Sequence, residues 1–535
     1  MKDRVSLTDF LMYHKETRPI SFHMPGHKGR GTLYGIYGFG DFIKNVVGND
    51  ITEIPGADAL QQPRERIKDI MEGYAGLYGV KHTELLVNGS SAGLIASILG
   101  SVPRGGKLLM GRNSHRAVYG ALRLGGVDPV YIMPEIDDET GLQLGLDPNK
   151  IEASLIEDPD IKAVLVTSPN YYGVLSDIER IASVVHLHGR ILIVDQAHGA
   201  HLKFFDYLRS EDGLPHRAAE NCGADIVVDS THKTLLSFTG SAILNICTER
   251  PDVSRISELL RMLQTTSPSY LLMGSLDINQ QILRMDGYNL IKNWDADIKY
   301  FYEEAAQIAG LGLIDRIDLD ETKVSITMSA LGLSGPKLAE ELEKRNIWVE
   351  LTHGDYVMLM TGLGNERGDY EDILAVLRDL SAHYGGRIQG MESESSASKT
   401  EPAAQNMAQK QAKNEIQAVA KNEAQVANKN ASQPVDKIAE LRTPSSDSAL
   451  IERLEQRKIP DTYEEVPLYS AEGRVLYESI IPYPPGTPIA CPGEVLSKSV
   501  ILYVRDQLVA QHVVLGVDEE GRVKVESDCV LFKEI

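Results

Sequence analysis

The chain has 535 residues, with 54 Lys and Arg against 76 Asp and Glu, which gives a formal net charge of −22 at pH 7. Because a single core stops growing at roughly 250–300 residues, this length predicts two or more domains and enough core for an enzyme. The negative field would repel nucleic acid and anionic membranes and would mildly favour cationic ligands, so we expect neither nucleic acid nor a membrane as a partner.

The spacing of the cysteines and the lengths of the apolar runs indicate the cellular compartment of the protein. The four cysteines lack CxxC spacing and are scattered along the chain, at Cys222, Cys247, Cys491 and Cys529. This pattern is typical of reduced packing residues, not of a disulfide framework or a zinc site. The opening stretch MKDRVSLTDFLMYHKETRPI has no continuous apolar core of signal-peptide length, and no apolar run reaches about 18 residues. We therefore expect a soluble, cytoplasmic protein.

From about residue 63 to residue 300, helix-like periodicity alternates with short apolar runs. The segment PRERIKDIMEGYAGLYG opens with proline and places its apolar residues on one face, which predicts a helix. Further helices are predicted at 91–102, 116–126 and 178–189. The runs that predict buried strands are 84–87, 107–110, 129–133, 162–166, 190–194 and 225–228. This alternation predicts an α/β fold, with a mostly parallel sheet covered by helices on both faces.

The remaining segments predict smaller units. Strand-like and helical stretches beyond the large domain, 61–290, predict a small α+β domain over 291–385. Between Glu392 and Lys437 there is no aromatic residue, so 386–447 is expected to be a disordered or loosely helical linker. Residues 448–535, with the strand-like runs VILYV and VVLGV, are expected to form a compact C-terminal domain, and 1–60 an N-terminal arm with an active-site loop.

Two charged residues follow buried strands of the predicted sheet. Lys233 follows the run ADIVVD, at the strand edge where open α/β folds bind ligands, although a solvent-facing loop lysine is the commoner case. Asp195 ends the run ILIVD, where an ionised carboxylate needs a partner such as a protonated aromatic ring nitrogen. Helix capping, a salt bridge, or metal binding with His198 and His201 are the alternatives for this aspartate.

A third element lies in LLVNGSSAGL, where Ser90 and Ser91 fall between a predicted strand and a predicted helix. Hydroxyls and free N–H groups at a helix N-terminus can bind an anion, although an ordinary serine cap explains them equally well. The chain lacks GxxxxGK[ST] and GxGxxG at this point, so a single phosphate is favoured over a nucleotide. A lysine able to form an imine, a buried carboxylate and a phosphate site match the three handles of pyridoxal phosphate.

The early loop SFHMPGHKGR carries His23, His27 and Lys28. Pro25 and Gly26 stand between the two histidines and break the helix that would place both on one face. We therefore expect no metal site, and the favoured interpretation is a loop that closes over the active site.

Eight motifs, SFHMPGHKGR, DITEIPGADAL, VNGSSAG, GRNSHRAV, DQAHGAH, DSTHKTLLSFTGSAIL, QTTSPSYLLMGSLD and PYPPGTPIACPGE, follow one another along the chain. Their order and spacing resemble those of the bacterial ornithine/lysine/arginine decarboxylases, in the shorter form without an N-terminal wing domain. The resemblance covers almost everything except the 386–447 linker. It implies a pyridoxal-phosphate-dependent enzyme with the aminotransferase-like fold, known as fold type I.

The resemblance also implies roles for individual residues. Lys233, in the family's S-x-H-K pattern, would form the imine with the cofactor, and Asp195 would pair with its ring nitrogen. His115, in GRNSHRAV, would stack on the ring, although the residues alone favour a surface-loop histidine. Ala197 and His198, in DQAHGAH, would belong to the same set of cofactor contacts.

Phosphate and substrate contacts follow from the same resemblance. The phosphate would be held by Ser90, Ser91, Ser230 and His232. Thr265, in TTSPSY, would reach the phosphate from the neighbouring subunit, which implies a homodimer or higher oligomer with active sites at the interface. Glu494, in PYPPGTPIACPGE, would face the distal cation of the substrate, with a surface Gly-Glu turn as the alternative.

Two positions depart from the family pattern. Gln196 stands where the family usually has glutamate in D-E-A-H-G, and the run Asp58 to Pro63 lacks the usual histidine of D-D-L-H-x-P. Neither is an expected cofactor contact, so these departures put substrate preference or activity in doubt, not cofactor binding.

The expected reaction is decarboxylation of lysine, arginine or ornithine to cadaverine, agmatine or putrescine. The residues leave the substrate open, and they leave Lys233, His232 and water as candidate proton donors. Another pyridoxal-dependent reaction, such as transamination or elimination, and a non-catalytic aminotransferase-like protein are the alternatives.

Overall fold

The computed structural model describes residues 6–397, 454–483, 486–509 and 513–527. Its large domain contains a seven-stranded sheet in the order β2-β8-β7-β6-β5-β3-β4. The strands are β2 (His82–Leu86), β3 (Lys107–Gly111), β4 (Asp128–Ile132), β5 (Ile161–Thr167), β6 (Ile191–Asp195), β7 (Ile226–Asp229) and β8 (Ala242–Ile246). Strands β4, β3, β5, β6 and β7 run parallel, whereas β8 is antiparallel to both of its neighbours. The predicted mostly parallel α/β sheet is confirmed, and β8 is an additional strand.

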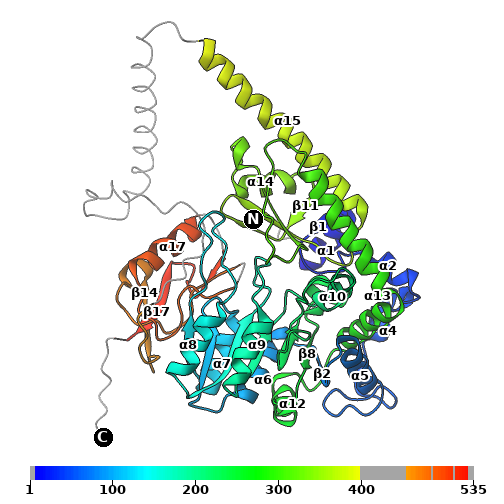
Figure 1. The fold of residues 1–535 in the computed structure, drawn as a ribbon, viewed down its shortest axis with the longest axis vertical. Coiled ribbons are helices and arrows are strands. Elements are labelled where there is room, and N and C mark those ends of the chain that lie inside the picture. Colours follow the sequence, from blue (N-terminus) through cyan, green and yellow to red (C-terminus); the bar gives the residue numbers. More distant parts are fainter. Residues whose placement is uncertain (1–5, 398–453, 484–485, 510–512, 528–535) are drawn as a thin grey trace.

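Helices cover both faces of this sheet (Figure 1). They include α5 (Arg66–Tyr78), α6 (Gly89–Ser101), α7 (Arg116–Gly125), α8 (Pro148–Glu157), α9 (Ile178–Leu187), α10 (Leu202–Glu211) and α12 (Val253–Leu263). Leu108 and Met110 of β3 face a core shared with α6, α7 and α12, whereas Leu109 faces the core shared with α8 and α9. Because successive side chains of a strand point to opposite faces, burial of both faces explains the continuous apolar runs.

The first strand of the N-terminal segment pairs with the small domain. The segment contains α1 (Leu7–Thr17), β1 (Ile20–Phe22), α2 (Gly31–Ile36), α3 (Gly40–Lys44) and α4 (Val46–Asn49). Strand β1 pairs in parallel with β11 (Ile347–Val349) of the small domain. The small domain adds β9 (Gly312–Leu313), β10 (Lys323–Thr327), β12 (Leu351–His353), β13 (Tyr356–Met360) and α14 (Gly335–Glu343), with the sheet order β12-β13-β10-β9.

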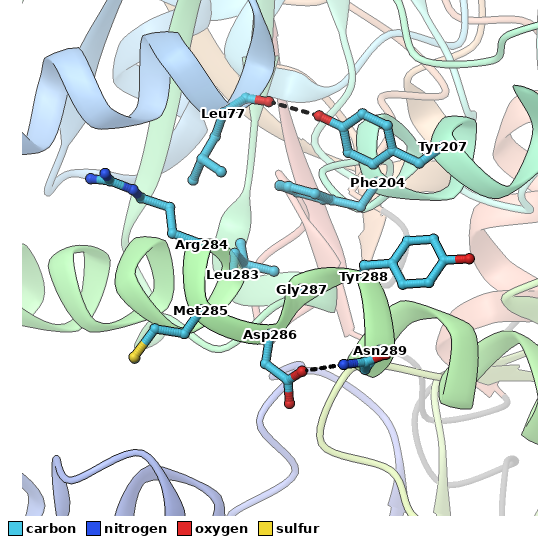
Figure 2. A pocket seen from close by; sticks show the side chains of 10 residues that line it. All are labelled: Leu77, Phe204, Tyr207, Leu283, Arg284, Met285, Asp286, Gly287, Tyr288 and Asn289. Carbon is cyan, nitrogen blue, oxygen red and sulfur yellow. Dashed lines mark hydrogen bonds between the residues drawn. The ribbon is translucent and has the colours of Figure 1, made fainter.

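Two long helices lie side by side next to the small domain, as Figure 1 shows: α13 (Tyr270–Ala305) and α15 (Arg367–Ala397). Helix α13 kinks at Asp286, which has φ −146° and ψ 15°, and the carboxylate of Asp286 accepts a 2.6 Å hydrogen bond from Tyr37. A surface pocket of about 380 Å³ lies at this kink, between α13, α10 and the end of α5 (Figure 2). Helix α15 extends past residue 385, and residues 398–447 of the expected linker lie outside the described residues.

The C-terminal domain contains β14 (Tyr463–Pro467), β15 (Ile481–Tyr483), α17 (Lys498–Val509), β16 (Val513–Leu515) and β17 (Arg522–Glu526). The prediction of a strand at VILYV was wrong, because this run lies inside α17. Val500, Ile501 and Val504 are buried, a helical spacing that places one face of α17 on the domain core. The short apolar run alone does not reveal this longer period.

Membrane insertion was assessed from the helices of the described ranges. None of these helices combines the length and the apolar content that a bilayer crossing requires.

Candidate active site

The site gathers at the carboxyl ends of two neighbouring parallel strands. Strand β6 ends at Asp195, which lies opposite Val228 near the end of β7. The chain then forms the short helix α11 (Thr231–Thr234), which carries Lys233 just beyond the strand. The Nζ atom of Lys233 lies 2.9 Å from Nε2 of His198. The fold therefore brings three of the predicted cofactor contacts, Asp195, His198 and Lys233, to one edge of the sheet.

Burial shifts the pKa values of Lys233 and Asp195 at this edge of the sheet. The surrounding protein lowers the pKa of the Lys233 amine, although the carboxylates of Asp195 and Glu350 oppose this shift. Burial raises the pKa of Asp195, against the opposing effects of Lys233 and of the Ala197 N–H, which donates to Asp195 Oδ1 at 3.2 Å. A lowered pKa makes the neutral, nucleophilic form of an amine easier to reach.

Hydroxyl groups meet at the start of α6. Ser230, which follows β7, donates a 2.8 Å hydrogen bond to Ser90 in the first turn of α6. Ser91 is the next residue of that turn. His232 Nδ1 lies 2.6 Å from the carbonyl oxygen of Ser241, so Nδ1 carries the proton. Burial lowers the pKa of His232 to about 4, so its Nε2 is a neutral acceptor at pH 7.

Two further histidines of the predicted site are also neutral. His115 is the N-cap of α7, and its Nδ1 accepts a 3.2 Å hydrogen bond from the Ala117 N–H. Burial, with the nearby charge of Lys233, lowers the pKa of His115 to about 3. His198 contacts the ring of Tyr171 edge-on at 4.8 Å, and burial holds its pKa well below the usual value. Both rings lie within the electrostatic field of Lys233.

The loop that carries His23 and Lys28 lies directly against α11. The Gly26 N–H donates a 2.8 Å hydrogen bond to the carbonyl of His232. A Cβ atom at Gly26 would lie 2.3 Å from the Leu235 carbonyl oxygen, so only glycine allows this approach. The loop therefore lies beside the helix that carries Lys233, and its role in closing over an active site stays a prediction. Within the described ranges, no group of three or more His, Cys, Asp or Glu side chains could hold a metal ion.

Thr265 and Glu494 lie outside this group of residues. Thr265 is exposed in the loop before α13, and its carbonyl oxygen accepts a 3.0 Å hydrogen bond from Gln61. Glu494 is buried, and its carboxylate lies 2.9 Å from Nη2 of Arg112 and accepts a 2.7 Å hydrogen bond from the Cys491 N–H. The roles of Thr265 toward a neighbouring subunit and of Glu494 toward substrate stay predictions.

Sequence reasoning missed two charged residues of the small domain, Glu350 and Lys323. The carboxylate of Glu350 lies 2.7 Å from His23 Nδ1 and accepts from the Met24 N–H at 3.0 Å and from Tyr171 at 3.1 Å. Burial would raise the pKa of Glu350, but His23, the Met24 N–H and the charge of Lys323 hold it at about 2. The available signal was a single charge within each of the strand-like runs WVELTH and KVSITMSA. Such charges usually face solvent, so the signal was weak.

This arrangement has the donors that pyridoxal phosphate requires. Lys233 offers an amine of lowered pKa for a carbonyl carbon, and Asp195 offers a buried carboxylate for a ring N–H. The paired hydroxyls of Ser90 and Ser230 at the first turn of α6 suit a phosphate. The residues present therefore fit the cofactor implied by the sequence motifs.

The mostly parallel sheet, with Lys233 just beyond β7, identifies an α/β protein with the aminotransferase-like fold of type I enzymes. The chain belongs to the Orn/Lys/Arg decarboxylase family. The model of the family's major domain matches residues 5–311, and the model of its C-terminal domain matches residues 447–516. Membership places the chain among the amino-acid decarboxylases.

Relatives span nearly the whole chain. The arginine decarboxylase of Bacillus anthracis is 29% identical over 522 residues, covering 95% of this chain and 94% of the relative. The arginine decarboxylase of Bacillus subtilis is also 29% identical, with 95% and 94% covered. A lysine decarboxylase of Pseudomonas aeruginosa is 23% identical, with 90% and 73% covered.

Solved structures agree on the fold. The constitutive lysine decarboxylase of Escherichia coli aligns with a TM-score of 0.65 at 20% identity, covering 97% of this chain and 81% of that one. The lysine decarboxylase A of Pseudomonas aeruginosa aligns with a TM-score of 0.67 at 20% identity, covering 97% and 80%.

Proposed function

We propose that this protein is a cytoplasmic, homodimeric decarboxylase of a basic amino acid that uses pyridoxal 5′-phosphate. The observation that carries the proposal is the Lys233 amine, which has a lowered pKa and lies 2.9 Å from the ring of His198. The family membership supports the decarboxylation, and the buried carboxylate of Asp195 at the neighbouring strand end supports the cofactor.

Each of the predicted contacts has a role toward the cofactor. Lys233 would hold its aldehyde carbon, Asp195 its ring nitrogen and His115 the face of its ring. The phosphate would be held by Ser90, Ser91, Ser230 and His232. When bound, pyridoxal phosphate supplies a ring that accepts the electron pair left on the substrate carbon as carbon dioxide departs.

The protein residues themselves prepare this chemistry. The burial of Asp195 keeps water from its carboxylate, which strengthens a charge-assisted hydrogen bond to a ring N–H. The Ser241 carbonyl fixes the tautomer of His232, so that Nε2 can accept but not donate. A neutral His115 can lie on an aromatic ring without the cost of burying a charge.

Arginine is the substrate that the relatives favour. The curated arginine decarboxylases match at 29% identity, whereas the lysine decarboxylases match at 22–23%. We infer agmatine as the product, and lysine and ornithine are the comparison substrates. The exposed Thr265 loop is accessible to a second subunit, which supports the homodimer.

The decisive experiment measures carbon dioxide release from L-arginine, L-lysine and L-ornithine by protein saturated with pyridoxal phosphate. We expect turnover of at least one, and loss of both turnover and the visible absorption of bound cofactor in Lys233→Ala. The matched control is Lys81→Ala, which removes an exposed lysine paired with Glu249 and should keep both signals. If wild-type protein releases carbon dioxide from none of the three, the proposed reaction is wrong.

A further inference from the structure

A series of buried polar side chains leads away from Lys233. In the described part of the chain, four of their atoms have no hydrogen-bond partner in the protein: His198 Nδ1, Lys323 Nζ, Asp320 Oδ2 and His201 Nδ1. All four side chains are at most 6% exposed. Buried polar atoms are usually paired, because an unpaired one costs free energy. Four such atoms in one series of buried side chains therefore call for a functional explanation.

These side chains form an ordered series. Lys233 Nζ lies 2.9 Å from His198 Nε2, which leaves the opposite ring nitrogen of His198 open. The charges of Lys233 and Lys323 both lower the pKa of His198. The carboxylate of Asp320 raises the pKa of Lys323. Its Oδ1 atom lies 3.1 Å from Nε2 of His201.

The stem of Lys323 is held in place by the loop before β10 and by the turn that follows β5. Lys323 donates its backbone N–H to the Asp320 carbonyl at 2.9 Å. A Cβ atom at Gly173 would lie 2.8 Å from Lys323 Cβ, so the lysine stem packs directly on this glycine. The amine is therefore positioned by backbone contacts, while its own donors stay open.

The proposed reaction consumes a proton at this place, and the inference rests on that proposed function. When the carboxylate leaves as carbon dioxide, its carbon–carbon bond breaks and the electron pair stays with the α-carbon. One proton must then be delivered to that carbon in each turnover. A positioned side chain delivers such a proton about 100- to 10,000-fold faster than solvent.

We propose that Lys323 is the proton store of this reaction and that His198 passes its proton to Lys233. Before the transfer, the neutral Lys233 amine takes a proton from His198 Nε2–H, while His198 Nδ1 takes one from the Lys323 ammonium across a bridging water. The Lys233 ammonium then gives its proton to the α-carbon and becomes a neutral amine again, ready to release the product. Lys323 regains a proton from solvent after the product leaves, so one proton is consumed in each cycle.

The charges around Lys323 suit a group that must both give and regain a proton. Burial lowers the pKa of Lys323 to about 8; Asp320 and Glu350 oppose this shift, and Lys233 adds to it. Two other groups face it, Lys28 from the active-site loop and the neutral ring of His198. The amine is thus charged at pH 7 and is close enough to neutrality to release its proton.

The test follows proton transfer in the reverse direction, with the amine product and without decarboxylation. Wild-type protein with cofactor should exchange one α-hydrogen of agmatine, cadaverine or putrescine for deuterium in D2O, as measured by NMR. In Lys323→Met we expect this exchange and kcat for carbon dioxide release to fall about tenfold to a hundredfold, with KM changed less than about twofold.

Two companion variants separate the possible roles of the amine. Lys323→Arg keeps the charge but cannot release a proton, so it should be as slow as Lys323→Met. Lys203→Met is the matched control, because it replaces another buried lysine, hydrogen-bonded to Asn221, that lies outside this series. Thermal melting followed by circular dichroism checks that every variant is folded.

The outcomes are distinct. Normal exchange in Lys323→Met, or recovery of exchange in Lys323→Arg, overturns the proton store. A large increase in KM for the amino acid alone, with normal exchange of the amine, would assign Lys323 to the substrate carboxylate and also overturn it. Failure of wild-type protein to release carbon dioxide refutes the proposed function itself, and the inference falls with it.

Discussion

At the scale of single residues, the buried amide of Gln196 contacts two carboxylates. Its Nε2 donates 3.0 Å hydrogen bonds to the carboxylates of Glu220 and Asp229, and its Oε1 accepts from the Ala219 N–H at 2.8 Å. Burial and the neighbouring Glu220 raise the pKa of Asp229 well above its usual value. The amide of Gln196 therefore offsets carboxylate repulsion, which gives this departure from the family pattern a structural role.

Gln196→Glu should destabilise the protein, because it removes the amide donor and adds a third carboxylate beside the buried Asp229 and the partly buried Glu220. We expect a loss of about 2–4 kcal/mol in the free energy of unfolding at pH 7, measured by urea titration. Burial and repulsion raise the pKa of a glutamate here, so it protonates and becomes a donor again as the pH falls. The loss should therefore shrink between pH 7 and pH 5.

The control for this substitution is Gln143→Glu. The Oε1 atom of Gln143 accepts a 3.1 Å hydrogen bond from Asn113, a contact that a carboxylate can keep. A smaller loss is expected there. Equal losses at both positions, or a loss at Gln196 that does not depend on pH, would contradict the explanation by carboxylate repulsion.

At the scale of elements, the sequence predicted the parallel strands well because they are buried on both faces and read as unbroken apolar runs. It could not place Lys323 and Glu350, since strand order and the packing of the small domain bring them to Lys233 from more than 80 residues away in sequence. It also misjudged VILYV, where tertiary packing of one helical face outweighs the β-branched composition.

The carboxylate of Asp58 binds backbone N–H groups at the start of α5. It accepts hydrogen bonds from the N–H groups of Arg64, Glu65 and Ile67, at 3.1, 2.8 and 3.0 Å. Partial burial would raise the pKa of Asp58, but these bonds and that of the Ala59 N–H lower it. The carboxylate thus satisfies free donors at the start of α5 and fixes the preceding loop.

Asp58→Ala should leave these N–H groups without their acceptor and cost about 1–2 kcal/mol of unfolding free energy. Asp58→Asn keeps one acceptor oxygen and should cost less than half as much. Differential scanning calorimetry of both variants at pH 7 gives the comparison. Equal melting temperatures for wild type and Asp58→Ala would show that the loop does not depend on this carboxylate.

At the scale of the whole molecule, one buried cation joins the C-terminal domain to the large domain. Arg112 directly follows β3, and its guanidinium donates to the carbonyls of Pro488 and Ile489 at 2.8 and 3.3 Å. It also lies 2.9 Å from the Glu494 carboxylate, and the two side chains are each 2% exposed. Because the Arg116 N–H also donates to the Gly486 carbonyl at 3.3 Å, the C-terminal domain reaches the helix that begins beside His115.

Arg112→Met should cost about 3–5 kcal/mol of unfolding free energy, because it leaves the Glu494 carboxylate buried without its cation. In the double variant with Glu494→Gln the loss should be smaller than the sum of the single losses, since the uncompensated charge is gone. Urea unfolding of the four proteins gives this coupling, and strict additivity would contradict it. A Glu494→Gln variant with normal stability but a raised KM would instead assign the carboxylate to the substrate's distal cation.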